Sequence, residues 1–432
     1  MTRLTRRGVI SAAAAASAAG PALGAARPDT IFTKARIAAD LARYVGFGIK
    51  ASGGKGDQAT AAWVAGELKT AGFAVQRQAF QAPMFTGAAR LSAGAHSAML
   101  VPQAIVVPTG PGGLEGPLAA RPAGTPASVR CDRAIAIVVL PPKRWTTFAA
   151  ADSKGPAAEA FAAGAAAVVL VTTGPTGEAL ALNAPSASSQ FDRPVAVLAP
   201  REAQPFLDAA ARGERGRLTM AGVSGRRPAF NVIGRLDRGA GRHLVISTPR
   251  SGWFTCGGER GGGVATWLAL ARWAPTALPH HDITFLATSG HEYENQGGAM
   301  FLEHLAPPPK STVLWLHLGA NVAARDWQEG ASLSPLPGPD PARVLMASRD
   351  LVPAASRLFA GQPGLETVRP ADPKTAAGEL SNILAAGYSR LAGVFGSHRF
   401  HHTRSDGIQC THPDATLAAA VSFRDLIAAA LA

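Results

Sequence analysis

Cysteine is scarce in this chain, and long hydrophobic runs are missing. The three cysteines are too few for a disulfide framework, and none has the Cys-x-x-Cys spacing of a common zinc site. In an oxidising compartment one pair of cysteines can still form a disulfide bond, and Cys256 with Cys410 is the candidate pair. No apolar run reaches the ~20 residues of a membrane span. We therefore expect a mature protein without a membrane-spanning segment.

Acidic residues are fewer than basic ones. The 42 Lys and Arg against 29 Asp and Glu give a formal net charge of +13, which is compatible with an acidic partner such as nucleic acid. The arginines are scattered, however, and no basic helix carries interleaved aromatic residues, so we expect no nucleic-acid partner. A hydrophobic content of 47% with 16% charged residues is typical of a globular protein.

The N-terminus has the pattern of an export signal. Arg6 and Arg7 precede an Ala-rich stretch at 11–19, and small residues at 22–25 offer a cleavage site. This order is typical of a twin-arginine signal peptide over residues 1–25, which is read by a translocon for folded proteins. The alternatives are a general signal peptide or a stray basic pair. We expect the mature protein in the periplasm or outside the cell.

Two kinds of sequence pattern occur along the mature chain. Residues 57–71 have the apolar spacing of an amphipathic helix, and residues 73–80 alternate like a strand. Between 86 and 221, Pro/Gly-rich turns separate short β-type runs, which indicates an inserted β-rich module. Strand and helix patterns then resume and continue to the C-terminus. We expect an α/β domain made of 26–85 and 222–432, with the insert at 86–221.

Three strand-like runs end in polar or glycine residues. Residues 283–288 run into Ser289-Gly290-His291-Glu292, residues 243–248 into Pro249-Arg250-Ser251-Gly252, and residues 313–317 into a segment containing Gly319. An open α/β sheet builds its reactive site at such strand ends. The pattern therefore predicts one catalytic-type domain.

Several common catalytic motifs are absent. No G-x-S-x-G elbow is present, which argues against a serine hydrolase. The glycine-rich segment 257–263 lacks the lysine of a phosphate-binding loop, and His291-Glu292 lacks the second histidine of H-E-x-x-H. These absences argue against a serine hydrolase, a phosphate-binding loop and an H-E-x-x-H metalloprotease.

Four segments, taken in chain order, carry a family resemblance. They are Ala163-Gly164-Ala165-Ala166-Ala167-Val168-Val169, Phe230-Asn231-Val232-Ile233-Gly234-Arg235, Gly261-Gly262-Gly263-Val264-Ala265 and Phe400-His401-His402-Thr403-Arg404-Ser405-Asp406. Their order resembles the superfamily of zinc-dependent bacterial aminopeptidases and glutaminyl cyclases, over most of the mature chain. The resemblance implies a mixed, mostly parallel sheet flanked by helices. It also implies that the first segment belongs to an inserted protease-associated domain.

The resemblance implies a metal centre in which several ligands are replaced. In the relatives, one of two metal ions is bound by a histidine and a late aspartate that do not contact the other ion. This chain has Thr248 and Gly319 at those two positions. At the ligand positions of the other ion this chain keeps residues of suitable type, namely Glu259, Glu292 and His402. Two carboxylates and an imidazole with one open position suit a catalytic zinc. The resemblance thus implies one zinc ion, with an empty centre as the alternative.

His291 falls where relatives carry the catalytic glutamate, and it is the candidate general base because an imidazole titrates in the right range. The alternative is a hydrogen-bonded histidine without a chemical role. The residues expected around the substrate are Trp253, Phe254, Tyr293, Glu379 and His401, the last also an alternative to His402. The implied activity is hydrolysis of a peptide or an acylated amine. A catalytically inactive pseudopeptidase that binds a partner and a glutaminyl-cyclase-type acyl transferase are the alternatives.

Overall fold

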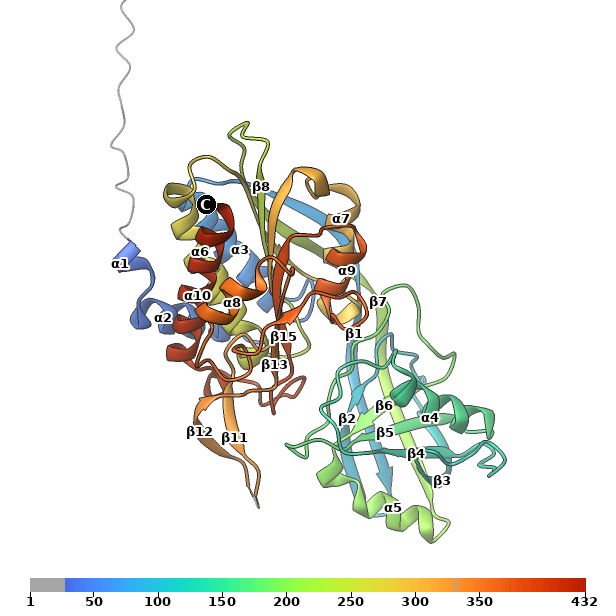
Figure 1. Ribbon diagram of the computed structural model, residues 1–432. Helices are drawn as coiled ribbons and strands as arrows, with labels where there is room; N and C mark the ends of the chain where they lie inside the picture. Colours follow the sequence, from blue (N-terminus) through green and yellow to red (C-terminus); the bar gives the residue numbers. More distant parts are fainter. Residues whose placement is uncertain (1–27, 331) are drawn as a thin grey trace, which may run out of the picture.

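The computed structural model describes residues 28–330 and 332–432, which form two lobes joined by a pair of long strands (Figure 1). The expected signal peptide at 1–25 lies outside the described residues. Among the helices that the structure describes, none combines the length and the apolar character needed to cross a bilayer.

The larger lobe is built on a mostly parallel sheet. Its strands are β7 (Arg215–Leu236), β8 (His243–Pro249), β9 (Asp282–Thr288), β10 (Thr312–Leu318), β13 (Arg343–Ala347), β14 (Arg369–Pro370) and β15 (Leu391–Gly396). Their order across the sheet is β7-β9-β8-β10-β15-β13-β14. The central strand β8 pairs in parallel with both β9 and β10. The three expected strand ends therefore meet at one edge of the sheet, as the sequence pattern predicts.

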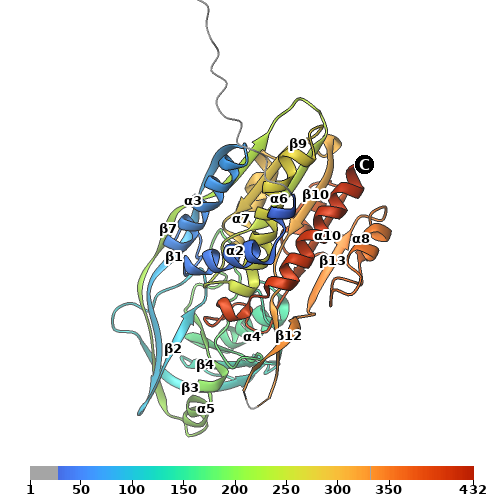
Figure 2. The same ribbon diagram turned by 90° about the vertical axis from the view of Figure 1, so that its left-hand side faces the viewer.

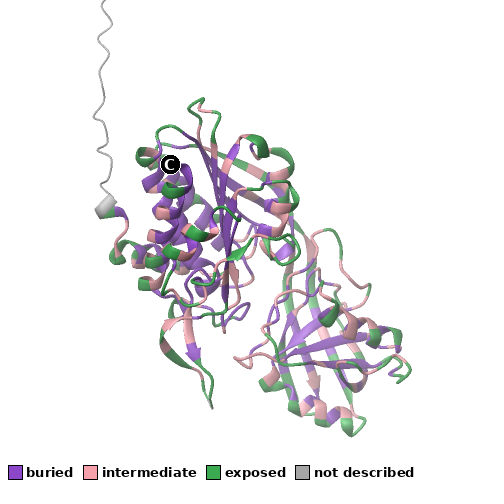
Figure 3. Ribbon diagram, viewed as in Figure 1, coloured by how far each residue is buried: buried purple, intermediate pink, exposed green. Residues whose placement is uncertain are grey.

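Helices cover both faces of this sheet (Figure 2). They are α1 (Pro28–Ile31), α2 (Lys34–Gly46), α3 (Lys55–Thr70), α6 (Gly262–Ala277), α7 (Gln296–His304), α8 (Val352–Leu358), α9 (Glu379–Ala385) and α10 (Pro413–Leu431). Alternate strand residues face opposite layers: Leu244 and Ile246 pack with α2, α3, α6 and α10, whereas Val245 packs with α7 and α9. The central strands are consequently buried along most of their length (Figure 3). This mixed α/β architecture confirms the expected fold class.

The smaller lobe contains shorter strands and two helices. They are β2 (His96–Pro102), β3 (Leu114–Pro122), β4 (Ile135–Leu140), β5 (Ala167–Thr172), β6 (Val195–Leu198), α4 (Ala151–Ala162) and α5 (Gln204–Ala211). The strands β3, β4, β5 and β6 pair in parallel, and their alternating side chains fill two apolar clusters. Beside the larger lobe, β11 (Arg325–Gln328) and β12 (Ser334–Pro339) form a separate two-stranded hairpin.

The two lobes share one antiparallel ladder. Strand β1 (Ala74–Ala93) pairs with β7 from Ala74 opposite Arg235 to Ser92 opposite Arg217. Within this ladder Gly87 lies opposite Gly222, and a Cβ atom on either residue would meet the partner backbone at less than 3 Å. The expected domain boundaries at 85/86 and 221/222 fall beside this glycine pair, inside the two strands. Alternating hydrophobicity does not mark such a boundary because the strand pattern continues through it.

Candidate functional site

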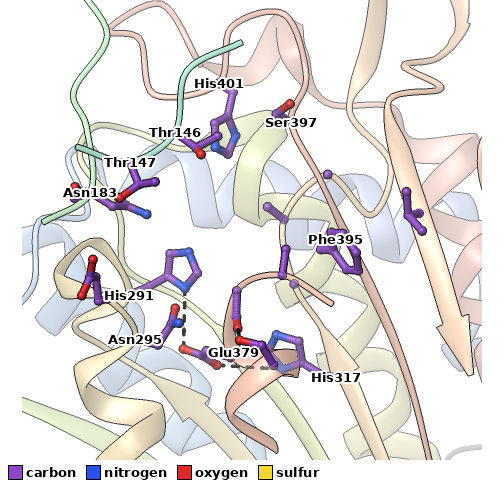
Figure 4. Close-up of a pocket in the computed structure, with 18 of the residues that line it drawn as sticks. Thr146, Thr147, Asn183, His291, Asn295, His317, Glu379, Phe395, Ser397 and His401 are labelled. Carbon is purple, nitrogen blue, oxygen red and sulfur yellow. Dashed lines mark hydrogen bonds and ion pairs between the residues drawn. The ribbon is translucent and has the colours of Figure 1, made fainter. Parts of the chain in front are cut away.

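The strand ends of the larger lobe face the smaller lobe across a cavity of about 670 Å³. Figure 4 shows residues of both lobes projecting into it. The lining includes Thr146, Thr147 and Asn183 from the smaller lobe and His291, Asn295, His317, Gly319, Glu379, Asn382, Phe395 and His401 from the larger lobe. The cavity thus lies at the strand-end position where α/β proteins bind their ligands.

A buried ion pair lies behind this cavity. Residues 257–261 form one π-helical turn directly before α6, and the turn carries Glu259 and Arg260. Nη2 of Arg260 lies 2.6 Å from Oε1 of Glu259, and the two side chains are 0% and 1% exposed. The backbone N–H groups of Gly258 and Glu259 donate to Asp406, which holds the turn against the C-terminal loop. Single π-helical turns are frequently found at functional sites.

Two adjacent histidines complete a cluster with Glu259. Nε2 of His402 lies 3.4 Å from Oε1 of Glu259, and the rings of His401 and His402 stack with their centroids 4.0 Å apart. One ligand atom from each of Glu259, His401 and His402 lies within 4.8 Å of the others. His402 adopts a left-handed backbone conformation with φ of +60°, which is uncommon for a residue other than glycine. This buried cluster has the donor types that hold a metal ion.

The charges in the cluster are strongly coupled. Burial opposes ionisation of Glu259, but Arg260 and the two histidines outweigh it and hold the pKa of this carboxyl well below its usual range. Burial, followed by repulsion from His402, lowers the pKa of His401 well below that of a free imidazole. At neutral pH the cluster therefore contains an ionised Glu259 and a neutral His401, with the Arg260 guanidinium as the counter-charge.

Glu292, expected as a metal ligand, does not belong to this compact cluster. Its Oε1 accepts a hydrogen bond from the backbone N–H of Ser52 at 2.7 Å, and its Oε2 accepts one from the Ser251 hydroxyl at 2.8 Å. The carboxylate is buried and ties the loop after β9 to the loops before α3 and after β8. Among the expected ligands, Glu259 and His402 lie together, and the third group beside them is His401.

The candidate base lies on the cavity wall. Nδ1 of His291 lies 3.6 Å from Oε1 of Glu379, and Nδ1 of His317 lies 3.9 Å from the other oxygen of the same carboxylate (Figure 4). Thr288 donates a further hydrogen bond to Glu379 at 2.8 Å. Burial lowers the pKa of His291, and the positive charge of Arg260 lowers it further. His291 is therefore neutral at pH 7 and lies beside an acidic group.

Thr248 and Gly319, where the family resemblance implies two missing ligands, both lie against backbone carbonyl groups. The Thr248 hydroxyl donates to the carbonyl of Leu318 at 2.8 Å. A Cβ atom on Gly319 would come within 2.5 Å of the Val394 carbonyl oxygen, so an aspartate would not fit here without a shift. Neither position offers a carboxylate or an imidazole to a metal ion.

The three expected pocket aromatics lie at the junction between the lobes. The ring of Trp253 packs edge-on against Tyr293, and its Nε1 donates to Asn183 of the smaller lobe at 2.8 Å. Phe254 packs within the apolar cluster of the smaller lobe. These side chains are not among the lining residues of the large cavity in the described chain, whereas Glu379 and His401 are. The aromatic residues thus fasten the lobes together.

The smaller lobe also holds both site loops directly. The N–H of Ala181 donates to the carbonyl of His402 at 3.0 Å, and the N–H of Ala184 donates to that of Glu292 at 3.1 Å. All three cysteines lie in the described part of the chain, and each is a free, buried thiol, so the candidate pair Cys256 and Cys410 is not linked.

Arg260 is the site residue that sequence reasoning missed. The signal was an arginine next to a candidate ligand, inside a run of small glycines that gives a long side chain few neighbours on its own element. Its guanidinium and the imidazole of His402 approach the same oxygen of Glu259, so Arg260 belongs to the buried centre.

Comparisons with known proteins give a consistent fold. No protein-family model matches this chain, and no curated protein matches it. Among solved structures, it is similar to BSAP, a zinc aminopeptidase from Bacillus subtilis, with a TM-score of 0.70 at 17% identity, covering 93% of this chain and 94% of that one. A peptidase M28 precursor from Shewanella amazonensis SB2B gives 0.67 at 16% identity, covering 93% and 96%. An aminopeptidase from Aneurinibacillus sp. strain AM-1 gives 0.63 at 14% identity, covering 91% and 95%.

These similarities confirm the zinc-aminopeptidase-like fold implied by the sequence motifs. At such identities they show the fold alone. The protease-associated character of the smaller lobe remains a prediction.

Proposed function

We propose that this chain is an exported, non-catalytic relative of the zinc aminopeptidases that binds a peptide or an acylated amine. One observation carries the proposal: a cavity of about 670 Å³ is kept at the strand ends, while the centre behind it is a buried Glu259–Arg260 ion pair. A catalytic metal site needs an open coordination position facing the substrate. A guanidinium paired with the central carboxylate offers no such position.

The cavity wall supports recognition of an extended polar ligand. Amide and hydroxyl groups face it from both lobes, including Asn183 and Thr147 on one side and Asn295 and Asn382 on the other. Such groups donate and accept hydrogen bonds, as the backbone of a peptide requires. Glu379 adds a buried negative charge: burial opposes its ionisation, but contacts with His291 and His317 outweigh this and lower its pKa. A cationic amine of the ligand would pair with this carboxylate.

Binding can be tested with short peptides whose N-terminus is either free or acetylated. We expect wild-type protein to bind peptides in isothermal titration calorimetry and to leave them intact in mass spectrometry. Glu379→Gln should lower the affinity for peptides with a free N-terminal amine by about 10-fold or more, because a charge-assisted contact is lost. Glu303→Gln changes an exposed carboxylate and is the matched control. The proposal fails if no peptide binds, or if bound peptide is cleaved.

A one-zinc amide hydrolase is the second candidate function. The convergence of Glu259, His401 and His402 favours it, and so does the position of His291 on the cavity wall. It requires Arg260 to leave Oε1 of Glu259. Peptide cleavage that disappears in His291→Ala and after chelation would establish this function in place of pure binding.

A further inference from the structure

The buried centre contains an unusual number of unsatisfied polar atoms. Both oxygens of Glu259, all three nitrogens of the Arg260 guanidinium and Nδ1 of both His401 and His402 make no hydrogen bond with the described residues. Buried polar groups in folded proteins nearly always have partners. The Glu259–Arg260 contact and the approach of His402 to the same oxygen thus take the place of a hydrogen-bond network.

Considered without Arg260, the remaining donors suit a zinc ion. They are one carboxylate and two imidazoles, with ligand atoms within 4.8 Å of one another. A His₂Glu set completed by water is a common catalytic zinc arrangement. The site contains His401 in place of Glu292, whose oxygens are already bound to Ser52 and Ser251.

Arg260 is incompatible with a metal ion at this position. An arginine side chain is a permanent cation in proteins. Nη2 lies 2.6 Å from the same Glu259 oxygen that lies 3.4 Å from Nε2 of His402. A divalent ion bound between Oε1 of Glu259 and Nε2 of His402 would lie within a few ångströms of the buried positive charge of Arg260, where repulsion is weakly screened. The residues present therefore do not accept the metal while Arg260 keeps this place.

We propose that Arg260 is a built-in cation that replaces the metal and keeps a latent zinc site, made by Glu259, His401 and His402, closed. The arginine neutralises Glu259, the carboxylate that a metal ion at this site would need as a ligand. This inference shares the Glu259–Arg260 pair with the proposed function, but it does not depend on what the cavity binds.

The test is zinc binding by mature protein that has been purified with a chelator and then dialysed. By elemental analysis and calorimetry, we expect no stoichiometric zinc in the wild type and about one equivalent in Arg260→Met. Zinc affinity should rise by about 100-fold or more, since the repelling charge is gone. The melting temperature of Arg260→Met should rise on zinc addition, because the ion binds the folded state. Arg260→Gln is the second neutral variant, in case the methionine variant does not fold.

Three matched variants control the ligand assignment. Arg260→Lys keeps a positive charge and should stay metal-free. In the Arg260→Met background, His402→Ala should abolish zinc binding, whereas Glu292→Gln should retain it. The proposal is overturned if wild type binds zinc as tightly as Arg260→Met, or if folded Arg260→Met and Arg260→Gln both fail to bind it. A metal-free wild type that binds no peptide would defeat the proposed function and leave this inference intact.

Discussion

Nη2 of Arg260 lies 2.6 Å from Oε1 of Glu259, its neighbour in the chain, and neither side chain reaches solvent. Consecutive residues on a helix normally point in different directions, but here both belong to a π-helical turn and face the same interior. The pair is sequestered from water between the C-terminal loop and the strand ends. Removing one partner leaves the other as an uncompensated buried charge.

Stability should therefore depend on both members of the pair. Glu259→Gln leaves Arg260 without a counter-charge, and we expect it to lower the free energy of unfolding by about 3–5 kcal/mol in urea titrations. The double variant Glu259→Gln/Arg260→Met carries no buried charge at this place and should lose less than Glu259→Gln alone. Losses that simply add across the double-mutant cycle would contradict the coupling.

A second buried pair occupies the end of β8. Nε of Arg250 lies 3.1 Å from Oδ1 of Asp57, and the guanidinium also donates to the carbonyls of Ala287 and Phe230. Arg250→Met should cost about 3–5 kcal/mol of unfolding free energy, because Asp57 stays buried. The control is Lys34→Met, since Lys34 pairs with Asp414 on the exposed surface and its loss should change the stability far less than Arg250→Met does. Equal losses in the two variants would argue against a structural role for Arg250.

Stability should also fall in mild acid because His317 is buried in its neutral form. Burial lowers the pKa of His317 to about 4, against about 6.5 in an unfolded chain. Between these values the unfolded state binds a proton that the folded state does not. The stabilising effect is therefore complete above pH 6.5 and is lost as the pH falls toward 4.

Urea unfolding at several pH values between 7 and 4.5 measures this loss. His317→Gln keeps a polar group beside Ser247 and should reduce the proton uptake on unfolding by about one. The exposed His304→Gln is the control. An unchanged pH dependence in His317→Gln would show that this imidazole is not the group that titrates.

Export is expected to depend on the paired arginines near the N-terminus. The double change Arg6→Lys and Arg7→Lys should leave the precursor in the cytoplasm, because the twin-arginine translocon reads the arginine pair. Cell fractionation with an antibody to the mature protein measures this. Arg3→Lys leaves the pair intact and should be exported normally. Normal export of the double-lysine protein would leave a general signal peptide as the interpretation.

Much of the larger lobe could be predicted because its signals are local. The runs before Ser289 and Gly319 have the apolar character of buried strands, and the helix at 57–71 has an amphipathic period. The observed elements β9, β10 and α3 match them closely. The ladder of β1 and β7 could not be predicted in the same way. Its pairing joins residues more than a hundred positions apart, and nothing within either strand records the partner.

The sequence by itself determined the fold class and the order of the strands along the chain, because short-range periodicity and the order of the motifs are enough for these. That two metal ligands are missing at Thr248 and Gly319 is what the family resemblance implies. Only the tertiary structure decided that His401 joins Glu259 and His402, that Glu292 binds backbone and hydroxyl groups, and that Arg260 takes the central position. Those outcomes depend on how segments near 259, 292 and 402 converge. Burial then determines which charges pair, since an unpaired charge in that interior would be too costly to keep.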